Sequence, residues 1–288
     1  MPNTQELTRR IKSVKGTRKV TCAMQMVSAA KMRKAQNATI ASRAYAGLAW
    51  ELIFGLPKNQ EFSHPLLETH AKATKIGVVL ISTNRGLVGS LNSNLLGLIK
   101  KLEKDEPNLT VEFIVLGKKA VDGTRRMNKT IIAEFPKSDS IIDMAEVYPM
   151  ARLLSHHYAS GQYKKILLVY NQFVSTLVQK PTSKTILPLI AEIPTEQTQN
   201  PTDYTYEPNP EQIFLHLLPR ILESQLYQAV LESNASEHSA RMVMMKNATE
   251  SAGDIIDDLT LTFNQLRQTK ITTELSEITA GKIALENK

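Results

Sequence analysis

The sequence is poor in the features that mark disulfide-stabilised, secreted and membrane-spanning proteins. It contains one cysteine, Cys22, which excludes an internal disulfide, and a lone thiol in a basic helix is expected to pack rather than react. The longest apolar runs, near 76–81 and 166–170, are too short to cross a bilayer, and the first residues lack the apolar core of a signal peptide. We therefore expect a soluble, cytoplasmic chain.

The sequence also lacks the spacings that catalytic and metal-binding sites need. His156 and His157 are adjacent, so a helix directs them about 100° apart and they cannot share a metal on one face. Asp254, Asp257 and Asp258 cluster on a predicted helix, which is typical of a solvated acidic face. The remaining histidines have no metal-ligand spacing: His64, His70, His216 and His238. We expect no catalytic residue, no metal and no cofactor.

A glycine-containing loop at residues 85–90 is the stretch that most favours nucleotide binding. It follows a predicted strand and opens a helix, where a phosphate can bind at the helix N-terminus. The loop is neither Gly-x-Gly-x-x-Gly nor a loop ending in Gly-Lys-Ser/Thr, and glycines in this position more often make a tight turn. A nucleotide- or nucleic-acid-binding α/β protein with helical arms is therefore the alternative hypothesis.

The positive charge is concentrated at the N-terminus. Residues 1–43 contain ten Lys or Arg residues and one acidic residue, Glu6; this is +9, and since the whole chain carries +7, the remainder carries −2. A basic arm is typical of a segment that meets nucleic acid, anionic lipid or an acidic protein surface. The arm has no aromatic residue before Tyr45, so it lacks platforms for base stacking, which phosphate contacts alone would not need.

Residues 209–288 predict one very long helix. Asn209 can cap it, Pro210 suits its first position, and no strong stop follows until Gly281. Residues 210–285 would extend roughly 114 Å, whereas a compact chain of this size has a diameter of about 50 Å. Apolar residues recur in steps of three and four, as in a coiled-coil seam: Ile213, Leu217, Ile221, Ala248, Ala252, Ile255, Leu259, Phe263 and Leu266.

A second long helix is predicted at residues 3–54, which contain no proline. It would extend roughly 78 Å. Small residues allow close approach to a partner helix, and the C-terminal helix is the obvious partner in the same chain. One side is apolar and is expected to form the contact: Leu7, Ile11, Val14, Val20, Met24 and Val27.

Between the two helices the period of the pattern changes. A mainly parallel α/β domain is typical of such alternation of strands and helices. Strands are predicted at 76–81, 111–116, 131–135 and 165–170, with extended segments at 173–179 and 183–189. One helix is predicted to end at 102, and two more are predicted at 118–127 and 141–160.

Together these elements predict a long antiparallel coiled coil of the N- and C-terminal helices with an inserted Rossmann-like α/β domain. The expected divisions are an N-terminal helix at 1–56, an α/β foot at 75–190, a linker at 191–208 and a C-terminal helix at 209–288. Because the C-terminal helix is the longer one, its tip should outrun its partner and meet other protein. Such a design transmits force or position rather than performing chemistry.

Several stretches resemble the gamma subunit of F-type ATP synthases, the rotor of the central stalk, and the resemblance covers nearly the whole length. The N-terminal stretches SVKGTRKVT at 13–21 and AMQMVSAAKMR at 23–33 look like the family's N-terminal pattern. The stretches SEHSARM at 236–242 and NAT at 247–249 belong to the same resemblance.

Two further motifs carry the resemblance, each with a departure. The stretch STNRGLVGSLNSN at 82–94 is similar to the family's strand-turn motif, with Val88 where a cysteine is frequent and Asn84 where an aspartate is usual. The most specific motif is ITTELSEITAG at 271–281, which is followed by Lys282 where alanine is expected.

The resemblance implies a non-catalytic role that suits the expected shape. In the family the coiled coil lies inside a hexamer of alpha and beta subunits, and its asymmetry forces the catalytic sites of beta into different states. The α/β foot rests with the epsilon subunit on a membrane ring of c subunits, through which proton or sodium flow drives rotation. The resemblance thus implies a bacterial-type ATP synthase subunit, peripheral on the cytoplasmic face of the inner membrane.

The resemblance also implies which residues touch partners. Family residues that contact beta subunits match Met24, Arg241, Gln268, Thr272 and Glu274. A foot segment near the c-ring and epsilon matches Tyr204 and Tyr206.

Overall fold

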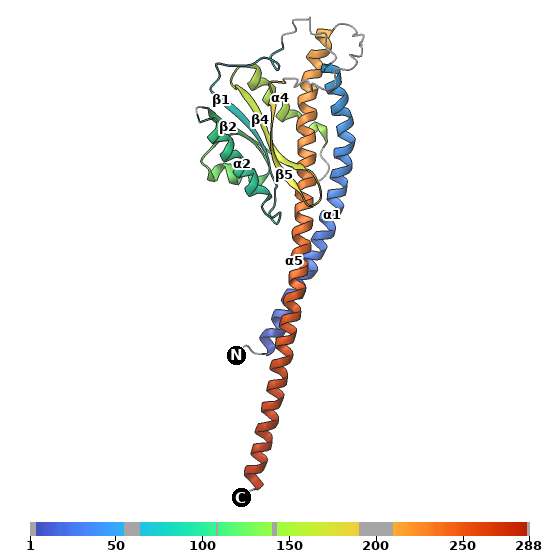
Figure 1. The fold of residues 1–288 in the computed structure, drawn as a ribbon, viewed down its shortest axis with the longest axis vertical. Coiled ribbons are helices and arrows are strands. Elements are labelled where there is room, and N and C mark those ends of the chain that lie inside the picture. The colour runs from blue at the N-terminus through green and yellow to red at the C-terminus, as the bar shows by residue number, and fades with distance from the viewer. Residues whose placement is uncertain (1–3, 55–63, 108, 140–142, 190–209, 287–288) are drawn as a thin grey trace. The chain divides into compact units, whose positions relative to one another are not determined.

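The computed structural model describes residues 4–54, 64–107, 109–139, 143–189 and 210–286. Two long helices, α1 and α5, come first and last along the chain, with a five-stranded sheet and shorter helices between them (Figure 1). The elements are α1 Thr4–Phe54, β1 Lys75–Ile81, α2 Leu91–Asp105, β2 Thr110–Leu116, α3 Lys118–Arg126, β3 Thr130–Phe135, the short 3-10 helix η1 Met144–Glu146, α4 Tyr148–Ala159, β4 Lys165–Phe173, β5 Gln179–Leu187 and α5 Pro210–Glu286.

The chain divides into two compact units. The first, here called the coiled-coil unit, combines Met1–Val27 with Met242–Lys288, and the second, here called the α/β unit, is Ser28–Arg241. Both long helices therefore contribute to both units. Within each unit the helices run antiparallel: Thr21 meets Thr249 in the coiled-coil unit, and Ser42 meets Gln228 in the α/β unit. The expected antiparallel coiled coil with an inserted α/β domain is confirmed.

The sheet has the strand order β3-β2-β1-β4-β5. Its first four strands are parallel, and β5 pairs antiparallel with β4 along the length of both strands, from Phe173 opposite Gln179 to Ile166 opposite Leu187. The prediction of extended segments at 173–179 and 183–189 was therefore wrong in its division. Residues 174–178 form the turn between two strands, because the hairpin needs a reversal there.

Alternating side chains of the strands feed two apolar cores, one on each face of the sheet. On one face α2 and α3 cover residues such as Val78 and Phe113. On the other face α4 and the N-terminal part of α5 cover residues such as Val79 and Ile166. The contribution of α5 to this core is Leu218, Ile221, Leu222, Leu226, Ala229 and Val230.

α5 is enclosed for most of its path through the α/β unit. From Ile221 to Arg241 its residues are buried, except for Tyr227 and Gln228, which are half-buried. Pro219 lies inside the helix without ending it. Proline has no N–H, so the backbone carbonyl four residues earlier, that of Leu215, lacks its helical hydrogen-bond donor. Leu215 is 54% exposed, so water can hydrogen-bond this carbonyl instead.

In the coiled-coil unit the α5 seam differs from the expected one at residue 255. Ile255 is 49% exposed, whereas Ile256 is 7% exposed, so the expected placement of Ile255 in the seam was wrong. The step from Ala252 to Leu259 is seven residues and can pass through either isoleucine, and packing selects Ile256. The observed seam is Met245, Thr249, Ala252, Ile256, Leu259, Phe263 and Leu266, all buried or half-buried.

The α1 seam is more polar than expected. Val20 and Val27 are 58% and 56% exposed, which contradicts the expected apolar side. Seven-residue steps from Leu7 and Val14 lead instead to Thr21, whose hydroxyl hydrogen-bonds the Thr249 hydroxyl at 2.7 Å. The pattern of apolar residues misplaced the seam because polar residues occupy part of it.

The C-terminal end of α5 is solvent-exposed. The helix passes through Gly281 and continues to Glu286, in agreement with the long helix expected from the sequence. Residues 267–283 are all exposed. A glycine inside a helix weakens it without forcing a stop, and nothing packs near Gly281 to demand a turn there.

Candidate functional site

The carboxyl ends of the parallel strands form one edge of the sheet, where α/β proteins commonly bind ligands. Residues 82–86 follow β1 there, Gly117 follows β2, and 137–139 lie just after β3. Connections run from β1 outward to β3 and then return to β4 on the other side of β1, so this edge contains the reversal of strand order at which ligand crevices form.

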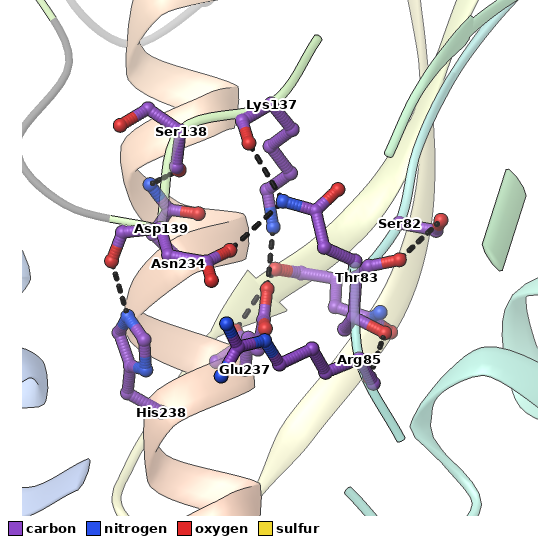
Figure 2. Close-up of polar contacts among 12 residues, drawn as sticks. Ser82, Thr83, Arg85, Lys137, Ser138, Asp139, Asn234, Glu237 and His238 are labelled. Carbon is purple, nitrogen blue, oxygen red and sulfur yellow. Dashed lines mark hydrogen bonds and ion pairs between the residues drawn. The ribbon is translucent and has the colours of Figure 1, made fainter. Parts of the chain in front are cut away.

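In this chain α5 fills that edge. The Lys137 ammonium contacts the Glu237 carboxylate at 2.6 Å, with side chains that are 0% and 1% exposed (Figure 2). The second oxygen of Glu237 accepts a 2.8 Å hydrogen bond from Arg241, whose guanidinium also donates to the Gly86 carbonyl at 3.4 Å. The position where a dinucleotide would bind in a Rossmann fold is thus occupied by the protein's own helix.

Two further bonds join α5 to the segment after β3. The Asn234 amide donates to the Ser138 carbonyl at 3.3 Å, and a ring nitrogen of His238 lies 3.0 Å from the Asp139 carbonyl (Figure 2). Together with Glu237 these residues are spaced i, i+3 and i+4, so they lie on one face of α5. Residues 137–139 contact that face.

The loop at 82–90 is held by hydrogen bonds to the segment that follows β3. The Asn84 amide donates to the Lys137 carbonyl at 2.7 Å and to the Asp139 carboxylate at 2.9 Å. Gly117 has a φ of +91°, and a Cβ there would lie 2.6 Å from the Ser82 carbonyl oxygen, so only glycine allows this close approach. The glycines at 86 and 89 belong to a strand-to-helix turn, and the nucleotide-binding alternative is not supported.

Electrostatics favour an ionised Glu237 and a neutral His238. Burial alone would raise the pKa of Glu237, but the charges and hydrogen bonds of Lys137 and Arg241 outweigh it and hold that pKa below its usual value. Burial lowers the pKa of His238, outweighing the Glu237 carboxylate and the Asp139 carbonyl, which raise it. Because the unfolded imidazole binds a proton more readily, the contribution of His238 to stability is present above about pH 6.5 and is lost below it.

The residues expected to contact partners lie in different surroundings. Met24 is half-buried on α1, whereas Gln268, Thr272 and Glu274 are exposed on α5. The Thr272 hydroxyl donates to the Gln268 carbonyl at 3.0 Å, and Glu274 lies 3.7 Å from Lys270. Arg241 is 8% exposed and belongs to the buried cluster. Tyr204 and Tyr206 lie outside the described residues.

Glu274 also borders an open depression of about 330 Å³ in the coiled-coil unit. Its walls come from the first turns of α1 and from α5: Thr4, Gln5, Thr8, Phe263, Arg267, Lys270, Ile271 and Glu274. The start of α1 is thus packed against the part of α5 that carries the expected contact residues.

Sequence reasoning missed Lys137 and Glu237. They are 100 residues apart, so no local spacing connects them. Glu237 lies in the stretch SEHSARM at 236–242, which carried the family resemblance, but a polar run in a helix is expected at the surface. The fold buries that run because α5 crosses the sheet edge.

Neither a metal centre nor a membrane span is found in the described part of the chain. Its His, Cys, Asp and Glu side chains form no group of three that could hold a metal ion. None of the helices within residues 4–54, 64–107, 109–139, 143–189 and 210–286 is long and apolar enough to cross a membrane.

Comparison with known proteins gives full-length matches. The profile of the family described as ATP synthase matches residues 3–285. The ATP synthase gamma chain of Roseiflexus castenholzii is 42% identical over 289 residues, covering 99% of both chains. That of Pelotomaculum thermopropionicum is 40% identical over 288 residues, covering 99% of this chain and 100% of the relative.

Solved structures with the same fold include rotor components. One chain from the rotor of the Euglena gracilis mitochondrial ATP synthase matches with a TM-score of 0.64 and 18% identity, over 93% of this chain and 98% of that one. A chain from the OSCP/F1/c-ring assembly of the same enzyme matches with a TM-score of 0.67 and 19% identity, over 98% and 94%. At these identities the likeness concerns the fold.

Proposed function

Because the chain belongs to the gamma-chain family of the ATP synthases, we propose that it is the central rotor shaft of a bacterial-type F-type ATP synthase. It couples ion flow through a membrane ring of c subunits to conformational change in a hexamer of alpha and beta subunits. The chain is a non-catalytic part of this membrane-associated complex, and ATP is made in beta.

The observation that carries this proposal is the full-length relation to gamma chains at about 40% identity. The sheet edge supports this proposal, because α5 covers the edge where a nucleotide would bind and is held there by the buried ion pair of Lys137 and Glu237. A Rossmann-like domain with its ligand crevice closed serves better as a rigid attachment for a helix than as an enzyme.

We further assign partners to the surfaces of the chain. The exposed end of α5, with Gln268, Thr272 and Glu274, would contact beta subunits. Met24, which is half-buried, and Arg241, whose side chain is 10% exposed, would also contact beta subunits. The foot, with Tyr204 and Tyr206, would rest on epsilon and the c-ring at the cytoplasmic face of the inner membrane.

The basic face of α1 suits an acidic protein partner. Arg9, Arg10, Lys12 and Lys15 are exposed, and so are Arg33 and Lys34 farther along the helix. Charges of one sign on an exposed helix attract surfaces of the opposite sign, and the attraction weakens with salt. Acidic loops of the hexamer would provide such a surface.

The first prediction is that the purified chain hydrolyses no ATP on its own, because it contains neither a phosphate-binding Gly-Lys-Ser/Thr loop nor an open sheet edge. A tagged chain should copurify with alpha and beta subunits, and adding it to those subunits should produce ATP turnover. The measurement is phosphate release by the chain alone and after reconstitution. ATPase activity that stays with the chain after all beta has been removed would refute the rotor function.

The second prediction concerns the polar contacts that the end of α5 would make with beta subunits. We expect the double variant Gln268→Ala with Thr272→Ala to fold and assemble, while ATP hydrolysis and ATP-driven proton pumping both fall about fivefold or more, since two lost polar contacts are worth roughly 1–3 kcal/mol together. The measurements are helix content, subunit stoichiometry, hydrolysis and pumping on one preparation.

The matched control is Gln265→Ala with Thr269→Ala. These residues are also exposed, and the Thr269 hydroxyl donates to the Gln265 carbonyl at 3.0 Å, as in the tested pair. Three residues of displacement turn the control pair about 60° around the helix. The control should keep near-normal activity. Equal losses in both variants, or no loss in either, would contradict a specific contact at Gln268 and Thr272.

A further inference from the structure

The Lys137–Glu237–Arg241 cluster is a buried ionic contact that the proposed function does not yet use. In the ion pair between Lys137 and Glu237, both side chains are at most 1% exposed. Glu237 and Arg241 are one helical turn apart on α5, whereas Lys137 comes from the segment that follows β3. One member of the cluster therefore belongs to the sheet edge and two belong to the helix.

The cluster lies where α5 leaves the α/β unit. Arg241 is the last residue of that unit, and Met242 begins the part of α5 that belongs to the coiled-coil unit. Any torque that passes along α5 between the two parts of the helix must therefore be resisted by contacts at or before Arg241. Upstream of this cluster the contacts of α5 with the sheet are mainly apolar, through residues such as Leu222 and Leu226.

Apolar contacts and ion pairs resist rotation differently. Burial of apolar surface is non-directional, so a helix held by it can shift or rotate slightly with little loss. A desolvated ion pair is directional, because a small displacement leaves charges buried without partners. At this edge Asn234, Glu237, His238 and Arg241 bond to residues 137–139 and to Gly86 from one helix face within two turns. Rotation of α5 would break all of them together.

We propose that the Lys137–Glu237–Arg241 cluster is a rotational lock that fixes α5 to the α/β unit, so that torque passes between the foot and the shaft without slippage. This inference rests on the rotor function proposed above. Lys137 is the positioning residue on the foot, and its ammonium pairs with the Glu237 carboxylate on α5. Arg241 keeps Glu237 in the orientation that meets Lys137.

The test removes the foot's charge and leaves the helix pair intact. In Lys137→Met the side chain keeps a similar length, and Glu237 keeps Arg241 as its partner, so no buried charge is left alone. The matched control is Lys129→Met, which removes a lysine from the more exposed pair with Glu103, 3.0 Å apart in the same unit. Assembled complexes containing wild-type or variant chains are compared.

Two readouts are expected to change in Lys137→Met and not in the control. Amide hydrogen exchange in residues 234–241 should rise about tenfold, as expected when a bond to a charged group is lost from a local structure. Protons pumped per ATP hydrolysed should fall about twofold or more, because hydrolysis in the hexamer continues while the foot lags behind the shaft. Normal coupling in Lys137→Met would overturn the lock.

A reversible cross-link tests whether the role is mechanical. Asn234 and Ser138 are adjacent, so Asn234→Cys with Ser138→Cys joins the helix to the foot by a reducible disulfide, in a Cys22→Ala background. In the Lys137→Met complex, oxidation should restore coupling and reduction should remove it again. Coupling that stays low after the disulfide has formed would overturn the lock. A wild-type chain that assembles without coupling would instead refute the rotor function.

Discussion

Glu237→Leu is expected to lower the free energy of unfolding of the α/β unit by about 3–5 kcal/mol, because it leaves the Lys137 ammonium buried without a counter-charge. The Lys137 side chain is 0% exposed and has its charge partner in Glu237, 2.6 Å away. Arg241 also loses its partner, although its side chain is 10% exposed and keeps the Gly86 carbonyl. The measurement is chemical denaturation of the isolated chain at pH 7.5.

A more exposed ion pair of the same unit provides the control. Glu103→Leu removes a carboxylate that is 20% exposed and pairs with Lys129, so its cost should be no more than about 1 kcal/mol. The double variant Lys137→Met with Glu237→Leu should regain much of the loss, because two apolar side chains of suitable size replace the buried charges. If Glu237→Leu costs no more than Glu103→Leu, the cluster is not the buried ionic contact described here.

The second large effect is expected in the seam of the coiled-coil unit. Ile256→Ala should destabilise that unit by about 2–5 kcal/mol, because it removes buried methyl and methylene groups and leaves a cavity between the helices. Ile256 is 7% exposed and lies between Ala252 and Leu259 in the seam. Hydrogen exchange of the α5 amides at 249–266, together with thermal unfolding, measures the loss.

The neighbouring residue makes an unusually close control. Ile255→Ala is the same substitution one position earlier on the same helix, but Ile255 is 49% exposed, so its cost should stay below about 1 kcal/mol. Equal costs at the two positions would mean that the seam does not pass through Ile256. A larger cost at Ile255 would restore the seam expected from the sequence.

Much of the secondary structure followed from local patterns. The start of α5 at Pro210 agrees with a capping residue followed by proline, and the strands β1 to β4 coincide with short apolar runs bounded by turns. The motif ITTELSEITAG at 271–281 identified the family without any structure. These features depend on residues close together in the chain, so one sequence is sufficient to show them.

The seam and the contact surface depended on more than local pattern. Ile255 and Ile256 have the same side chain and both fit a seven-residue step, so only the packing of α1 against α5 distinguishes them. Val20 and Val27 were expected inside because they are apolar, yet Thr21 occupies the seam. Gln268, Thr272 and Glu274 were named from the family resemblance alone, and the structure adds that they are exposed.

The sequence by itself determined two long helices, an α/β insertion and a family, because periodicity, caps and motifs are local properties. Only the tertiary structure decided that α5 closes the carboxyl edge of the sheet and that Glu237 and His238 are buried there. A polar run in a helix has no means of indicating what will cover it. Lys137, 100 residues earlier, reaches Glu237 only because strand order and the path of α5 bring them together, and that buried ionic contact depends on both.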